Sequence, residues 1–134
     1  MINTPYTPYK FILQGPLRIK KNSKRIICVW AKGRKRPMIV SSEAYLKWEK
    51  HARMHLRFQL PPGRFQLMTA PLWVKVLAFY KGSKPDLSGV LESVGDCLEG
   101  IVYENDRQIQ SWDGSRLFHD KANPRTEIEV RIIS

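Results

Sequence analysis

The sequence predicts an α/β (α+β) fold, a single compact domain in which two main helices pack on a mixed β-sheet. Three observations indicate it: a nearly uncharged run of strand-forming residues at 72–80, two segments at 43–58 and 88–99 with apolar residues at helical spacing, and alternation of polar and apolar residues at 126–133. The chain has 134 residues, the length of one ordinary domain, and no repeat or linker divides it. We therefore expect residues 1–134 to form one domain.

The N-terminal segment predicts a strand followed by a basic arm. The strand begins at Phe11 and ends at Gly15-Pro16, because proline cannot donate to a β-ladder. The arm, about residues 17–40, interleaves cations with the strand-forming patch Ile26–Trp30. This pattern indicates either a hairpin or a mobile loop. Trp30 lies in this arm and would either contact a binding partner or pack on the body of the protein.

The first helix is expected from Glu43 to about Phe58. Ser41-Ser42 offers an N-cap, and Pro61-Pro62-Gly63 stops the helix. One side is apolar and is formed by Tyr45, Trp48, Ala52 and Leu56. The other side carries Lys47, Lys50, Arg53 and Arg57. This row of cations either meets phosphates or is an ordinary solvated face.

The second half predicts strands around one further helix. The 72–80 run reads as a central strand buried on both faces. The helix at 88–99 contains Gly89 and Gly95, which weaken it. Gly100 is expected at its C-terminal cap, followed by a turn at 104–106, a strand at 108–112, a turn at Asp113-Gly114 and a final strand with one solvated face.

Composition restricts the class of protein. The formal net charge is +11, and residues 1–60 hold 14 Lys and Arg against two acids. A basic surface of this kind suits nucleic acid, an anionic membrane or an acidic protein, and nucleic acid is the favoured partner. The chain is too apolar and aromatic for a disordered basic tail, so it should fold by itself.

Cysteine and histidine usage argues against a zinc site. Cys28 and Cys97 lie far apart without metal-ligand spacing to His51, His55 or His119. Two buried reduced thiols are expected, and reduced thiols fit the cytoplasm; a disulfide is the alternative. No apolar run reaches the roughly 18 residues of a membrane span, and the N-terminus has no apolar signal region. We expect no membrane association and no small-molecule cofactor.

Carboxylates concentrate in one segment, about residues 86–108. Six acids and no Lys or Arg lie between Asp86 and Asp106. A protein that binds a polyanion keeps acids away from it unless they hold a metal at the bond to be cut. If the strand after Asp106 pairs with the 72–80 strand, the two residues meet at one end of the sheet. The segment therefore predicts a Mg²⁺ site, and the alternative makes Asp86 a helix cap and Asp106 a turn former.

The stretch from Pro85 to Ile109 resembles the signature of the RusA family of Holliday-junction resolvases. In that signature an Asp-x-Asp-Asn motif and a following Lys precede an Asp-x-Leu, a Gly and an Asp-Asp-x-Gln. The matching residues here are Asp86, Asp96-Cys97-Leu98, Gly100 and Asp106-Arg107-Gln108. The resemblance implies a small homodimer that binds branched DNA at four-way junctions and, with Mg²⁺ (Mn²⁺ as a substitute), nicks two opposing strands. Such proteins occur in bacteria and phages.

Four positions depart from that signature. Ser88 replaces the second Asp, Gly89 the Asn, Glu92 the Lys and Asn105 the first Asp of the pair. We therefore expect a rearranged site in which Asp86, Glu92 and Asp106 are catalytic and hold the metal, with Asp96 either a further ligand or a hydrogen-bond acceptor behind the ligands. A cation from the basic arm or from a partner subunit would replace the missing lysine. The residues expected to bind DNA are Lys20, Lys21, Lys24, Arg25, Lys32, Arg34, Lys35, Arg36, Lys50, Arg53 and Arg57.

Two other functions remain open. The first is a RusA-like protein with a decayed site that binds branched or duplex DNA without cutting it. The second is a ribonuclease or a protein that binds acidic partners, which leaves the signature from Asp86 to Gln108 unexplained.

Overall fold

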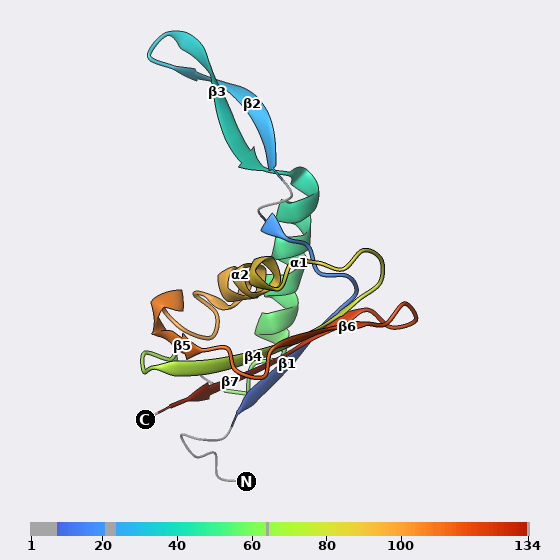
Figure 1. Ribbon diagram of the computed structural model, residues 1–134. Coiled ribbons are helices and arrows are strands. Elements are labelled where there is room, and N and C mark those ends of the chain that lie inside the picture. Colours follow the sequence, from blue (N-terminus) through green and yellow to red (C-terminus); the bar gives the residue numbers. More distant parts are fainter. Residues whose placement is uncertain (1–7, 21–23, 64, 134) are drawn as a thin grey trace.

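The computed structural model describes residues 8–20, 24–63 and 65–133, and a mixed sheet forms its centre (Figure 1). The strand order is β1 (Tyr9–Gln14), β7 (Arg125–Ile132), β4 (Leu72–Tyr80) and β5 (Ile109–Ser111), and β6 (Arg116–His119) also pairs with β4. β7 is antiparallel to β1 and β4, whereas β5 and β6 run parallel to β4. The sheet is therefore mixed, as predicted.

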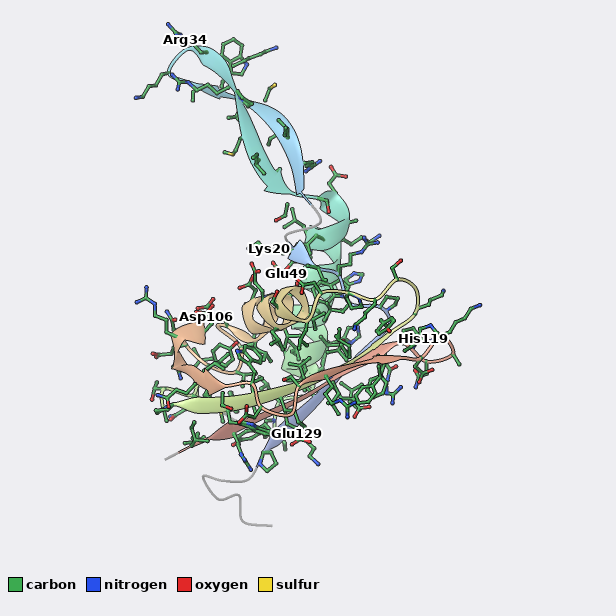
Figure 2. The ribbon with its side chains drawn as sticks, in the orientation of Figure 1. Lys20, Arg34, Glu49, Asp106, His119 and Glu129 are labelled. Carbon is green, nitrogen blue, oxygen red and sulfur yellow. The ribbon has the colours of Figure 1, made fainter. Side chains whose placement is uncertain are left out.

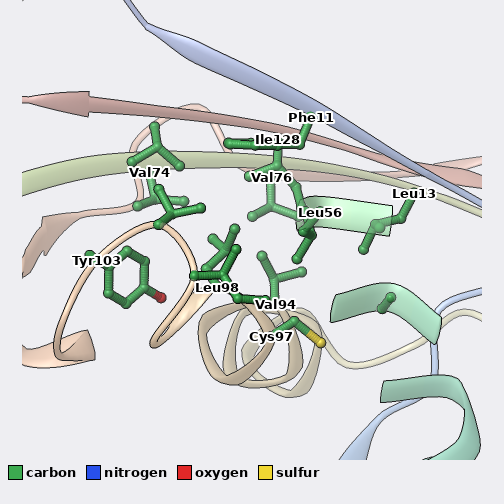
Figure 3. Close-up of a cluster of buried hydrophobic side chains, with 14 of the residues drawn as sticks. Phe11, Leu13, Leu56, Val74, Val76, Val94, Cys97, Leu98, Tyr103 and Ile128 are labelled. Atoms are coloured by element: carbon green, nitrogen blue, oxygen red, sulfur yellow. The ribbon is translucent and has the colours of Figure 1, made fainter. Parts of the chain in front are cut away.

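The register of the sheet builds the core. Phe11 lies opposite Ile128, and Ile128 lies opposite Val76, so three buried side chains from three strands form one row. Alternate residues of β4 and β7 are buried on this face. Figure 3 shows how Val94, Leu98 and Tyr103 pack against the row.

The prediction that 72–80 is buried on both faces is wrong for the second face. Trp73, Phe79 and their neighbours there are only half-buried. They lie under arginine side chains: the Arg125 guanidinium is 3.7 Å from the Phe79 ring centroid, and that of Arg131 is 4.2 Å from the Trp73 ring. Cation–π contacts let an apolar strand keep this face without a covering helix.

Two helices cover the other face of the sheet (Figure 1). The first, α1 (Glu43–Phe58), starts where the Ser42 hydroxyl accepts a hydrogen bond from the Tyr45 amide at 3.1 Å. The second, α2 (Leu87–Leu98), buries an apolar side that includes Val90, Val94 and Cys97. Both helices were predicted within one residue of their observed bounds.

A separate two-stranded sheet projects from the body (Figure 1). It consists of β2 (Lys24–Ala31) and β3 (Arg34–Ser41), which pair with each other in an antiparallel hairpin. Lys32 (φ 51°) and Gly33 (φ 74°) form its two-residue turn, the geometry that suits right-handed strand twist. The basic arm is thus a hairpin from residue 24, and residues 21–23 lie outside the described part.

Two expectations about local structure were wrong. β6 was not predicted, because four residues flanked by a turn are too short to show alternation. Cys28 is exposed on the hairpin, whereas Cys97 is buried as expected, and both thiols are free. Burial raises the pKa of the Cys97 thiol to about 12.

Within the described chain, neither helix has the length and apolar character needed to span a bilayer.

Candidate active site

One side of α2 borders a cavity of about 340 Å³. Ser88, Glu92 and Gly95 reach it from the helix, since residues three and four apart share a helical face. Asp106, Ile109 and Trp112 form the opposite wall. Gly95 lies against side chains of this wall: a Cβ there would lie 3.7 Å from the Tyr103 hydroxyl and 3.8 Å from the Trp112 ring, an ordinary contact.

Three carboxylates converge where α2 ends. Asp96, Glu99 and Asp106 each offer an oxygen, and these oxygens all lie within 4.8 Å of one another. Asp96 and Glu99 are partly buried, and Asp106 is exposed. The Asp106 amide also donates to Glu99 Oε1 at 3.4 Å. Asp96 in the last turn of α2 and Glu99 at its C-cap are thus joined by Asp106 from the short helix η2.

Local hydrogen bonds position Asp106 in the short 3₁₀ helix η2 (Asp106–Gln108). The Asn105 side chain accepts from the Arg107 amide at 2.9 Å, and Gln108 Oε1 accepts from the Asn105 amide at 2.8 Å. The Gln108 side chain also donates to the carbonyls of Met68 and Ala70. Asn105, which replaces an Asp of the family signature, is therefore a capping residue here.

Asp86 lies at the other end of α2, at its N-cap. The Ser88 hydroxyl donates to Asp86 Oδ2 at 2.9 Å. At 1.5 Å per residue, Asp86 and Asp96 are separated by about 15 Å along the helix axis. β5 does pair with β4, but Ile109 lies opposite Leu72 at the start of that strand, whereas Asp86 follows its end. The register thus places Asp106 beside the C-terminal part of α2 and not beside Asp86.

Arg53 from α1 fixes the C-terminal end of α2. Its Nη1 lies within hydrogen-bonding distance of the carbonyl oxygens of Asp96 (3.2 Å), Cys97 (3.1 Å) and Glu99 (2.8 Å). These carbonyls belong to the last turn, whose acceptors have no partner within the helix. The guanidinium that was expected to bind DNA is therefore directed at α2, where it holds the backbone of two of the clustered acids.

Lys20 forms an ion pair with the cluster. Its Nζ lies 3.6 Å from Asp96 Oδ2, and its amide donates to the Ser93 hydroxyl at 3.2 Å. Figure 2 shows Lys20 and Glu49 beside α2. Burial raises the pKa of Asp96, Lys20 opposes this shift, and the charges of Glu92 and Glu49 add to it. Burial thus outweighs the effect of Lys20 on this pKa, and a further positive charge beside Asp96 would stabilise its ionised form.

The donor set fits a hard divalent cation. Mg²⁺ binds carboxylate oxygens at about 2.0–2.1 Å, so oxygens on opposite sides of the ion are about 4.2 Å apart. Oxygens within 4.8 Å of one another need only small side-chain movements to reach that spacing. Of the residues expected to hold metal, Asp96 and Asp106 lie in the cluster, Glu92 lines the adjoining cavity, and Asp86 is at the far end of α2.

Glu99 was missed by the sequence analysis. It is the C-cap residue just after α2, where the backbone is extended, so helical spacing from Asp96 does not place it; its only signal was its membership of the six acids of the segment.

The other basic residues expected to bind DNA occupy two surfaces. Lys50 and Arg57 are exposed on α1. Arg25 is exposed at the base of the hairpin and pairs with Glu43 at 2.9 Å. Lys24 begins β2, and Lys21 lies outside the described residues. The remaining four are exposed near the hairpin tip: Lys32, Arg34, Lys35 and Arg36.

Comparison with known proteins identifies a family. The family model described as Endodeoxyribonuclease RusA matches residues 24–131, from the first residue of the hairpin to the last strand. A search of curated proteins found no match. The matched range contains the hairpin, both helices and all six acids of the segment from Asp86 to Asp106. The chain belongs to the RusA family of endodeoxyribonucleases, which are metal-dependent Holliday-junction resolvases.

Proposed function

We propose that this protein resolves four-way DNA junctions by paired, symmetric nicks in DNA recombination and repair, with Mg²⁺ as cofactor and the groove beside α2 as active site. One observation carries the proposal. Three positions of the family signature, held here by Ser88, Glu92 and Asp106, line the same cavity, and a cluster of three carboxylates adjoins it. Chain segments 14 residues apart in sequence thus supply one site.

Asp96, Glu99 and Asp106 are the residues proposed to hold the metal, with Glu92 beside them on α2. Bound Mg²⁺ supplies Lewis-acid polarisation of a phosphoryl oxygen and a more acidic water. The chain orients the carboxylates: Arg53 holds the backbone of Asp96 and Glu99, and the capping bonds of Asn105 and Gln108 fix η2. Asp86, which accepts a hydrogen bond from Ser88 at the N-terminal end of α2, is proposed to contact the substrate.

Lys20 is the proposed replacement for the family lysine. The expected replacement was a cation from the basic arm, and Lys20 is the arm residue whose ammonium lies 3.6 Å from Asp96. A positive charge at this place stabilises negative charge that develops on the phosphate. DNA would reach the groove along the cations of α1 and the hairpin. A two-fold homodimer, as the resemblance implies, would match two opposing strands of the junction.

The alternative is a RusA-like protein that binds branched DNA without cutting it. Ser88 supports this alternative, because a hydroxyl already bonded to Asp86 is a weak ligand where the family has a carboxylate. Binding needs only the exposed cations, so the alternative predicts junction affinity without any metal-dependent cleavage.

The test is cleavage of a mobile four-way junction beside a matched linear duplex in Mg²⁺, Mn²⁺ and EDTA. We expect paired nicks in the junction alone, absent in EDTA and at least about 100-fold slower in Asp106→Asn, since metal-held charge stabilisation supplies several kcal/mol. Asp113→Asn is the control, because this exposed turn carboxylate lies outside the cluster. Tight junction binding without cleavage by the wild type would establish the alternative.

A further inference from the structure

The β2–β3 hairpin carries an exposed apolar face. Ile26, Cys28 and Trp30 point to the same side of β2 because strand residues alternate, and Ile39 lies directly opposite Ile26 on β3. Ile26, Trp30 and Ile39 are 71%, 72% and 70% exposed. A contiguous exposed apolar patch, unlike a single exposed side chain, often marks a binding surface.

The hairpin has no support from the central sheet in the described residues. β2 and β3 pair with each other in a sheet of their own (Figure 1). The exposed ion pair between Arg25 and Glu43 links its base to α1 and contributes little stability. An isolated two-stranded hairpin is only marginally stable in water. A partner that covers the apolar face would therefore also stabilise the hairpin.

The charge around this face selects the kind of partner. Near the tip, Lys32, Arg34, Lys35 and Arg36 are all exposed, and residues 17–42 contain no acid. Lys35 Nζ lies 5.8 Å from the centre of the Trp30 ring, so a cation and an aromatic face are side by side. Two copies of this tip packed together would bring like charges into contact. A polyanion with flat apolar faces, which is nucleic acid, fits both features.

The shape of the tip agrees with insertion. Its turn has only two residues, Lys32 and Gly33, both with positive φ, so the ribbon ends without a bulky loop. A two-stranded ribbon is narrow enough for the major groove of DNA. Arg34 marks this end of the molecule in Figure 2. Within a duplex, however, the flat faces of the bases are covered by stacking, and a branch point is where they become available.

We propose that the hairpin inserts at the branch point of a DNA junction and that Trp30 stacks on a base exposed there, while the neighbouring cations contact phosphates. This inference rests on the proposed function and adds to it the element that distinguishes branched DNA from duplex. Ile26 and Ile39 then cover the sugar and base edges nearer the body of the protein. Lys35, beside the indole ring of Trp30, contacts the phosphate backbone of the DNA.

The experiment measures binding in EDTA to a four-way junction with 2-aminopurine at one branch nucleotide, and to a linear duplex with the same label. Stacking on an indole quenches 2-aminopurine. We expect quenching by the wild type, its loss in Trp30→Ala and partial retention in Trp30→Phe. Junction affinity should fall about 5- to 100-fold in Trp30→Ala, with duplex affinity unchanged. Phe58→Ala, which removes an 80% exposed aromatic at the far end of α1, should match the wild type.

Each other result has one meaning. Equal quenching and equal junction affinity in Trp30→Ala would overturn the inference and leave the proposed function intact. If the wild type binds the junction no more tightly than the duplex, both this inference and the proposed function are overturned. If Trp30→Ala instead dissociates an oligomer in sedimentation without changing the branch-point signal, a second copy covers the hairpin and the inference is wrong. Because Trp30 is exposed, Trp30→Ala should not disturb folding. The circular dichroism spectrum of the variant should therefore match that of the wild type.

Discussion

Lys20 contacts α2 with both its backbone and its side chain. It is held at α2 by its own amide, bonded to Ser93, and its ammonium lies beside Asp96. Glu92 stands where the family signature has a lysine, so the groove lost one cation and gained one acid. In the proposed function, Lys20 restores this charge from another part of the chain without restoring the motif.

We predict that Lys20→Gln slows single-turnover junction cleavage by about 100- to 1000-fold, the usual cost of losing one group that stabilises transition-state charge. Junction affinity by gel shift should change much less, because one cation among many is removed. Lys75→Gln is the matched control, since Lys75 also forms an ion pair, with Glu129 at 3.4 Å, on the other face of the sheet. Cleavage by Lys20→Gln at the wild-type rate would show that the replacement cation is elsewhere.

At the scale of elements, α1 and η2 together decide where the carboxylates of α2 lie. Arg53 from α1 satisfies carbonyls of the last turn, and Tyr103, which precedes η2, donates to the Gly95 carbonyl at 2.7 Å. Both bonds act on the backbone of α2, not on its side chains. The cluster is therefore built by the packing of helix and turn around a fixed helix end.

We predict that Arg53→Met lowers the free energy of unfolding by about 1.5–3 kcal/mol, because partly buried carbonyls lose a charged donor. Urea unfolding measures it. Lys50→Met is the control on the same helix: it removes an exposed cation, so stability should stay within about 0.5 kcal/mol while DNA affinity falls. If Arg53→Met instead keeps its stability and binds DNA weakly, Arg53 belongs to the DNA-binding surface.

The elements that the sequence predicted well are those with local signals. The Ser42 cap and the proline stop at Pro61 fixed the ends of α1, and the alternation of 126–133 identified β7. β6 had no such signal, because its pairing with the far half of β4 depends on the whole sheet. For the same reason the neighbourhood of Asp106 was not predictable: a parallel β5 that starts at Leu72 carries Asp106 toward Glu99 and away from Asp86.

For the whole molecule, charge is divided between two regions with different tasks. The hairpin and the exposed side of α1 hold cations, and the groove between α2 and η2 holds acids (Figure 2). A polyanion attracted by the first region reaches a site that repels it unless a divalent cation is present. Metal dependence is thus expected from the charge distribution as well as from family membership.

Binding of Mn²⁺, followed by electron paramagnetic resonance, tests the carboxylate cluster most directly. We predict that Glu99→Gln, which removes one of the three converging carboxylates, weakens Mn²⁺ binding at least about 10-fold. Glu104→Gln, an exposed acid five residues along the chain and outside the cluster, should bind Mn²⁺ like the wild type. Equal Mn²⁺ affinity in wild type and Glu99→Gln would contradict a metal site at the end of α2.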